Sequence, residues 1–135
     1  MPQGTSEPHD EEQEVTITML VVDDEPLIRQ GLRAWLERVG HITVIGEANN
    51  GAEAVALAQT LHPDVVLMDI SMPPSDGLAA TASLRAAVPH CAVVLLSLYD
   101  DTSLRAHALA AGAAALVGKQ EGVESLLAAI REAAA

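Results

Sequence analysis

The chain has 135 residues, half of them hydrophobic, and a formal net charge of -12, with 7 basic residues against 19 acidic ones. This length fits one domain with one core, and the lack of a basic cluster argues against direct nucleic-acid binding, which depends on Lys and Arg to neutralise phosphates. Neither a signal peptide nor an apolar run long enough to span a bilayer is evident, so we expect a cytoplasmic protein without membrane contact.

The first residues are acidic and lack apolar periodicity. The segment MPQGTSEPHDEEQE holds five acidic residues and no Lys or Arg. Such a composition is typical of a solvated segment that cannot bury a core. We therefore expect a disordered acidic tail over residues 1–16 and one folded domain over residues 17–135.

After this tail, short apolar runs alternate regularly with helical patterns. Strands are expected at residues 18–22, 42–45, 65–68, 92–96 and 114–117, and helices at 26–39, 51–61, 78–88, 102–111 and 123–134. Continuous apolar strands indicate a parallel sheet with helices on both faces. The prediction is an α/β fold with a single (βα)5 doubly wound parallel sheet, for which the flavodoxin-like strand order 2-1-3-4-5 is a common solution.

Helix faces and boundaries follow from apolar spacing and turn residues. The inward positions are expected to be Ile28, Leu32, Trp35, Leu36 and Val39 in the first helix, and Val123, Leu126, Leu127 and Ile130 in the last. Gly40 stands where the first helix should stop. Asn49 or Asn50 can cap the second helix, and Ser75 or Asp76 the third. The single cysteine, Cys91, has no disulfide partner and is interpreted as a small apolar residue.

Polar residues follow four of the five expected strands, at the edge where parallel sheets bind ligands. Asp23 and Asp24 follow the first strand, Asp69 the third, Ser97 the fourth, and Lys119, the only lysine of the chain, the fifth. At ~4 Å and an effective dielectric of ~20, two carboxylates repel by roughly 4 kcal/mol. Such a cluster either has raised pKa values or holds a cation. An oxygen-only site with open positions favours Mg²⁺.

Each of these residues also has an ordinary structural interpretation. Asp23 or Asp24 could be the N-cap of the first helix, and Asp69 a polar strand end. Ser97 could be a turn residue, and Lys119 a surface charge. The four strand ends meet at one edge, however, and this co-location favours a functional site.

Five motifs together resemble the receiver domain of bacterial response regulators. They are VVDDEP (residues 21–26), VVLMDISMP (65–73), DG (76–77), LLSLYDD (95–101) and GAAALVGK (112–119). The resemblance covers about residues 18–133 and is strongest to the subfamily with a C-terminal helix-turn-helix output domain. It implies a switch that is not an enzyme, apart from catalysing its own phosphorylation and dephosphorylation.

The resemblance also implies roles for individual residues. Asp69 matches the phosphoacceptor, Asp23 and Asp24 the acidic pair that holds Mg²⁺ with Asp69, and Ser71 the position that lends a backbone carbonyl to the metal. Ser97 and Lys119 match the residues that bind the phosphoryl group. The implied partners are a histidine kinase and a second copy of the chain on phosphorylation. The implied output is transcription regulation by a DNA-binding domain absent from this chain; the alternative is a free-standing receiver or a phosphorelay intermediate acting through a partner.

Two positions depart from the family pattern, and three rival functions remain. Leu116 replaces the usual Tyr or Phe three residues before Lys119, and Gln120 replaces the proline that often follows it, which makes the family's cis peptide doubtful. Tyr99 either gates water access or packs as a loop aromatic.

An aspartate-nucleophile phosphatase would need Asp-x-Asp after the first strand, and a flavodoxin would need a phosphate loop there. A non-phosphorylated structural receiver is the third rival.

Overall fold

The structure is a computed structural model that describes residues 15–70, 77–98 and 102–135. Within these ranges the chain forms a five-stranded sheet of β1 (Ile17–Val22), β2 (Ile42–Ala48), β3 (Val65–Asp69), β4 (Ala92–Ser97) and β5 (Ala115–Gly118). The strands are parallel and lie in the order β2-β1-β3-β4-β5. The predicted α/β fold and strand order are therefore confirmed.

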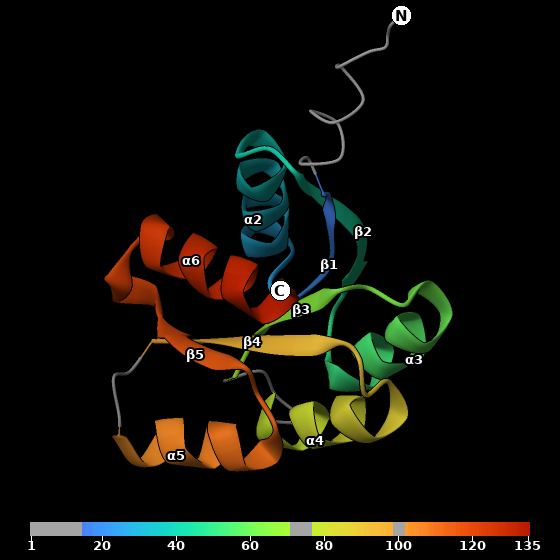
Figure 1. Cartoon of the computed structure of the whole chain (residues 1–135), viewed down its shortest axis with the longest axis vertical. Coiled ribbons are helices and arrows are strands. Elements are labelled where there is room, and N and C mark those ends of the chain that lie inside the picture. The colour runs from blue at the N-terminus through green and yellow to red at the C-terminus, as the bar shows by residue number, and fades with distance from the viewer. Residues whose placement is uncertain (1–14, 71–76, 99–101) are drawn as a thin grey trace, which may run out of the picture.

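Helices cover both faces of this sheet (Figure 1). One face carries α2 (Pro26–Arg38) and α6 (Val123–Ala134), and the other carries α3 (Gly51–Leu61), α4 (Gly77–Ala87) and α5 (Thr102–Ala111). A short 3-10 helix, η1 (Lys119–Glu121), leads from β5 into α6. Every crossover thus places a helix against an apolar face of the sheet, as expected for a doubly wound fold.

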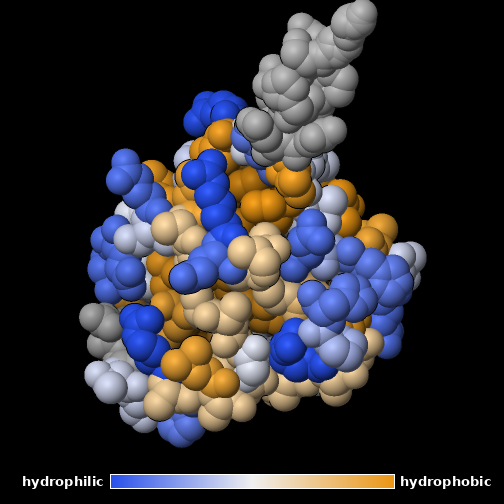
Figure 2. Space-filling view, viewed as in Figure 1, coloured by the Kyte–Doolittle hydropathy of each residue, from blue (hydrophilic) through white to orange (hydrophobic). Residues whose placement is uncertain are grey.

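The core has two layers because successive strand residues face opposite sides. In β1, Met19 and Val21 pack with α2 and α6, whereas Leu20 and Val22 pack with α3, α4 and α5. The second layer is rich in alanine, including Ala54, Ala58, Ala80 and Ala108. Alanine also occupies outward positions, and Figure 2 shows much of the surface over α4 and α5 in the pale orange of weakly hydrophobic residues.

Local signals fix several helix ends. Pro26 occupies the first turn of α2, where its missing N–H group costs no hydrogen bond. Gly40 follows this helix with a φ of +88°, a backbone conformation that glycine adopts readily. Asn50 rather than Asn49 caps α3, because its Oδ1 accepts a hydrogen bond of 2.9 Å from the backbone N–H of Glu53. The predicted stop and cap are confirmed.

The end of the second strand and two inward helix positions differ from the expectations. The second strand extends past Ile45 to Ala48 because Gly46, Glu47 and Ala48 pair with the last three residues of β1, after a bulge in the register. Ile28 was expected to face inward but is 45% exposed, and that prediction is wrong. Val123 was also expected to face inward but is 56% exposed, and that prediction is wrong too. It stands in the first turn of α6, at the rim of a pocket that α2 does not fill.

Some predicted features lie outside the described residues. They are most of the acidic tail, the cap candidates Ser75 and Asp76, the metal-binding carbonyl of Ser71, and Tyr99. The boundary after residue 16 therefore stays a prediction. Among the described helices, none is long and apolar enough to cross a lipid bilayer.

Candidate functional site

The carboxyl ends of four strands bring the candidate residues to one edge of the sheet. Asp23 follows β1 directly, Asp69 is the last residue of β3, Ser97 the last of β4, and Lys119 follows β5. The register aligns Asp69 with Leu96, and Ser97 with Gly118. Residues far apart in the sequence therefore meet because the strands are parallel and end at the same level.

Lys119 and Asp69 form an ion pair at the centre of this edge. The Nζ atom of Lys119 donates a hydrogen bond of 3.0 Å to Oδ2 of Asp69. Their side chains are 28% and 14% exposed, so both groups reach solvent. The only lysine of the chain thus lies where it can neutralise negative charge on Asp69 or on a group attached to it.

Asp23 is a buried carboxylate beside this pair. It is 3% exposed, and its Oδ1 accepts a hydrogen bond of 2.9 Å from the backbone N–H of Glu25. Burial raises the pKa of Asp23, and the charges of Asp69 and Asp24 raise it further, against the lowering effects of the Glu25 hydrogen bond and of Lys119. The ionised form therefore lacks charge compensation, which a cation at this position would supply.

The donor chemistry fits Mg²⁺ held by few protein ligands. In the part of the chain that the structure describes, no three His, Cys, Asp or Glu side chains form a group that could hold a metal ion. Mg²⁺ usually binds through one or two carboxylates, keeps several waters and takes oxygens from a phosphate. Asp23 and the exposed Asp24 supply such carboxylates next to Asp69, and the residues present fit this ion.

Ser97 faces away from the row of charged residues. Along the strands, the positions of Asp23, Asp69 and Lys119 continue the rows whose side chains pack toward α2 and α6. Ser97 continues the row of Val93 and Leu95, which packs toward α3, α4 and α5, and it is fully buried. Its hydroxyl therefore lies at the same edge of the sheet as the charged residues, but on the face covered by α3, α4 and α5.

The alternative interpretation of the first acidic pair as a helix cap is wrong. The N-cap residue of α2 is Glu25, and its side chain makes no capping hydrogen bond. Asp23 instead receives the N–H of Glu25 within the turn after β1. Neither Asp23 nor Asp24 is the cap of this helix.

Leu116, which stands where the family has an aromatic residue, is a core side chain. It is 3% exposed and packs in the cluster under α3, α4 and α5. Its carbonyl oxygen accepts a hydrogen bond of 2.7 Å from Nη1 of Arg105 on α5. The position thus links β5 to α5 through its backbone, independently of the side chain's identity.

Gly77 packs against the backbone that follows Asp69. Its N–H donates to the carbonyl of Ile70 at 3.1 Å. A Cβ atom at this position would lie 2.6 Å from Cα of Ile70 and 3.2 Å from the carbonyl oxygen of Asp69. The absence of a side chain therefore sets how closely α4 approaches the end of β3.

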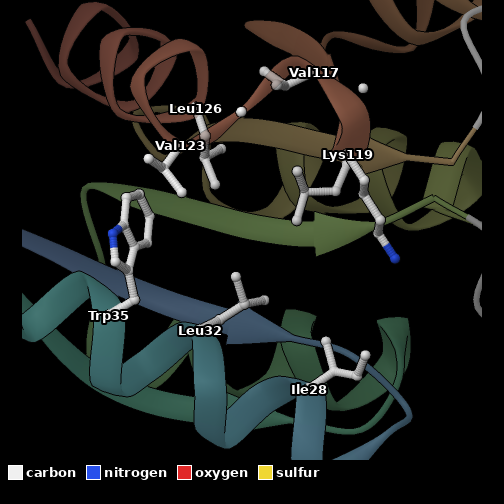
Figure 3. Close-up of a pocket in the computed structure, with 10 residues that line it drawn as sticks. Ile28, Leu32, Trp35, Val117, Lys119, Val123 and Leu126 are labelled. Atoms are coloured by element: carbon white, nitrogen blue, oxygen red, sulfur yellow. The ribbon is translucent and has the colours of Figure 1, made fainter.

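An apolar pocket that the sequence did not predict opens next to Lys119, between α2 and α6 (Figure 3). It has a volume of about 230 Å³. Its lining comprises Ile28, Leu32, Trp35, Leu96, Val117, Gly118, Lys119, Gly122, Val123 and Leu126. Trp35 and Leu32 point into it from α2, while the ammonium group of Lys119 points away from Trp35.

Comparison with known proteins gives one consistent result. The model of the response regulator receiver domain family matches residues 19–131. Response regulator GacA of Pseudomonas aeruginosa is 38% identical over 116 residues, which are 86% of this chain and 54% of that protein. A protein-glutamate methylesterase/protein-glutamine glutaminase of Anaeromyxobacter dehalogenans is 43% identical over 107 residues, 78% of this chain and 31% of that protein.

A solved structure agrees with these sequence matches. The LuxR-family two-component response regulator from Aurantimonas sp. has a TM-score of 0.84 and 29% identity, covering 88% of this chain and 85% of that one. The chain spans about half of the length of GacA, and less of the methylesterase.

Two glycine substitutions test the packing at the end of β3. Gly77→Ala should lower the free energy of unfolding by about 1–3 kcal/mol, because the new methyl group meets backbone atoms that cannot move aside. Gly31→Ala is the matched control: it lies within α2 with nothing within 4 Å, and should stabilise by about 0.5–1 kcal/mol. Urea unfolding followed by circular dichroism measures both free energies of unfolding. If Gly77→Ala stabilises the protein as Gly31→Ala does, the close packing of Gly77 against the backbone of β3 is contradicted.

Asp23→Asn should stabilise the metal-free protein at pH 7. The raised pKa means that folded Asp23 binds its proton more tightly than the unfolded chain does. The contribution of Asp23 to the wild-type stability therefore falls as the pH rises from the unfolded value of 3.8 through the folded pKa. The advantage of the Asn variant should be full at pH 7 and absent below 3.8. Thermal unfolding in EDTA across this pH range measures it; a variant less stable than wild type at pH 7 would refute the explanation.

Proposed function

The chain belongs to the response regulator receiver domain family, and we propose that it is a switch that accepts a phosphoryl group on Asp69. The observation that carries this proposal is the Lys119–Asp69 pair at 3.0 Å beside the buried Asp23. The pair brings a partly exposed carboxylate and a cation together beside a second, buried carboxylate, which supports the proposal. The arrangement suits transfer of a phosphoryl group to Asp69.

The proposed reaction is a nucleophilic displacement at phosphorus. A carboxylate oxygen of Asp69 forms a bond to phosphorus while the bond to the donor's leaving group breaks and its electron pair departs with that group. Lys119 then pairs with the phosphoryl oxygens instead of Asp69 Oδ2. Asp23 and Asp24 would hold Mg²⁺, which this family typically binds at its phosphorylation site, and the ion would supply positive charge there. We propose that the domain catalyses only its own phosphorylation and dephosphorylation.

The proposed switch works through Ser97. The new dianion attracts the Ser97 hydroxyl, which in the unphosphorylated state is buried on the side of α3, α4 and α5. Moving it would shift the end of β4 and the start of α5. Because Leu116 has no aromatic ring to move in concert, we propose that the backbone link from Leu116 to Arg105 carries the change to α5.

We propose a histidine kinase as donor and transcription regulation as output. The output proposal follows the match to a LuxR-family regulator and requires a DNA-binding domain that is not part of this chain. We also propose that the phosphorylated domain forms a homodimer. The match to a methylesterase shows that similar receivers occur with other outputs, which favours an alternative in which the domain acts through a partner protein.

The pocket between α2 and α6 is the proposed docking site for the kinase. A donor phosphohistidine must come within bonding distance of Asp69, so the protein that carries it covers the surface next to Lys119. That surface exposes Ile28 and Val123, which are 45% and 56% exposed. Apolar side chains at the centre of such a contact usually contribute most of the affinity.

Asp69→Asn should abolish labelling by a small phosphodonor such as acetyl phosphate with Mg²⁺, since an amide cannot act as the nucleophile. Glu124→Gln, an exposed acid in the first turn of α6, is the control and should label like wild type. Incorporation of one phosphoryl group is measured by intact-mass spectrometry, and its loss on brief treatment with alkali identifies an acyl phosphate. Undiminished labelling of the Asn variant would overturn the assignment of Asp69.

Ile28→Glu should slow phosphotransfer from a histidine kinase by about tenfold, because it places a charge in the apolar contact. Labelling by acetyl phosphate should stay unchanged, since the substitution leaves the acidic residues in place. Leu109→Glu on α5, where the side chain is 54% exposed, is the control and should leave both rates unaltered. Equal loss with both donors would show that the pocket acts on the site rather than on docking.

A further inference from the structure

Arg29 of α2 contacts the backbone of the turn after β1, which carries Asp23 and Asp24. Its Nη1 donates hydrogen bonds of 2.7 Å to the carbonyl oxygen of Asp23 and of 2.7 Å to Oδ1 of Asn49. Its Nε donates to Oε1 of Glu47 at 3.1 Å, and its side chain is 14% exposed. One guanidinium therefore joins the turn after β1 to the end of β2 and to the residue after it.

This geometry restrains the peptide that carries the metal-binding candidates. The Asp23 carbonyl is fixed by Arg29, and the Asp23 carboxylate accepts the N–H of Glu25 on the other side of the same turn. A guanidinium is planar and offers its donors in a rigid fork, so contacts in three directions fix its position. The N–H of Asp23 also donates to the carbonyl of Ala48 at 3.1 Å, so Arg29 is one of the contacts that set the direction of the Asp23 side chain.

The partners of Arg29 are themselves held in place. The backbone N–H and Nδ2 of Asn49 donate to Oε1 of Glu53 on α3, at 2.9 and 3.3 Å. Glu47 also binds Nη1 of Arg33 at 2.7 Å. The hydrogen bond from Arg33 is the main cause that lowers the pKa of Glu47, and Arg29 contributes further. Glu47 is therefore an ionised anchor at neutral pH, even without Arg29.

We infer that Arg29 is a positioning residue for the acidic site: it holds the turn after β1 so that Asp23 and Asp24 face the phosphoacceptor. This inference rests on the proposed function insofar as the oriented carboxylates hold Mg²⁺. Arg29 bonds to the carbonyl oxygen of Asp23 rather than to its carboxylate, so it acts through the Asp23 peptide. Residues that orient metal ligands from outside commonly change metal affinity by about 10–100-fold when removed.

Arg33 provides a matched control on the same helix. It shares the Glu47 carboxylate with Arg29 but is more exposed, at 43%, and its other contacts are with Glu37 and the carbonyl of Val44. Arg33→Gln therefore removes an ion pair to the same partner without touching the Asp23 peptide. A purely structural role of the arginine–glutamate pairs predicts similar effects of Arg29→Gln and Arg33→Gln.

The experiment uses the full chain and two readouts. In metal-free protein, amide hydrogen exchange measured by NMR should show faster exchange of the Glu25 N–H in Arg29→Gln, and wild-type exchange in Arg33→Gln. Calorimetric titration with MgCl₂ should show affinity weakened by about tenfold or more in Arg29→Gln, and within about twofold of wild type in Arg33→Gln. Arg29→Lys keeps one donor for the Asp23 carbonyl but loses the fork, and should be intermediate in both.

Each outcome separates this inference from the proposed function. Equal behaviour of Arg29→Gln and Arg33→Gln in both measurements would overturn the positioning role. If wild type fails to bind Mg²⁺, the proposed function is wrong, and the Glu25 exchange rates alone still decide whether Arg29 holds the turn. If Arg29→Gln does not fold, Arg29→Lys against Arg33→Lys gives the same comparison.

Discussion

The parallel register of the sheet is the constraint on which the site depends. Because the strands run in one direction and end at the same level, the residues after β1 and β5 and the last residue of β3 lie on one side of the sheet. A slip of one residue would turn every side chain of a strand to the other face. The strand β3 is paired with β1 on one side and with β4 on the other, and this double pairing fixes where Asp69 lies.

The charges at this edge are incompletely balanced by the protein. Asp23, Asp24 and Asp69 share one lysine, and the pKa of Asp23 is raised by its burial first and by the charges of Asp69 and Asp24 second. Arg29 does not neutralise these carboxylates, because it binds the backbone of Asp23 and the side chain of Glu47. The carboxylates at this edge therefore favour binding of a cation, while Arg29 restrains the backbone that carries Asp23. Different residues thus bind the charge and orient the groups that bind it.

The sequence predicted most of the fold because its signals are local. Periodic apolar residues, Gly40 and Asn50 gave strands and helices close to those observed, and Asp23, Asp69, Ser97 and Lys119 were found because strand ends are recognisable. The tertiary contacts could not be predicted from the sequence. The Arg29 contact goes to a backbone carbonyl, which has no sequence signature. The exposure of Val123 depends on how far α2 and α6 stand apart at the rim.

Trp35 is the only tryptophan of the chain and lines the pocket beside Lys119. Excitation at wavelengths that tyrosine does not absorb therefore reports on this one indole, without an introduced dye. A protein that covers the pocket, or a movement of α6 against α2, changes the polarity around the ring and with it the emission. The natural chain thus carries its own fluorescent sensor for the surface through which we propose it meets its kinase.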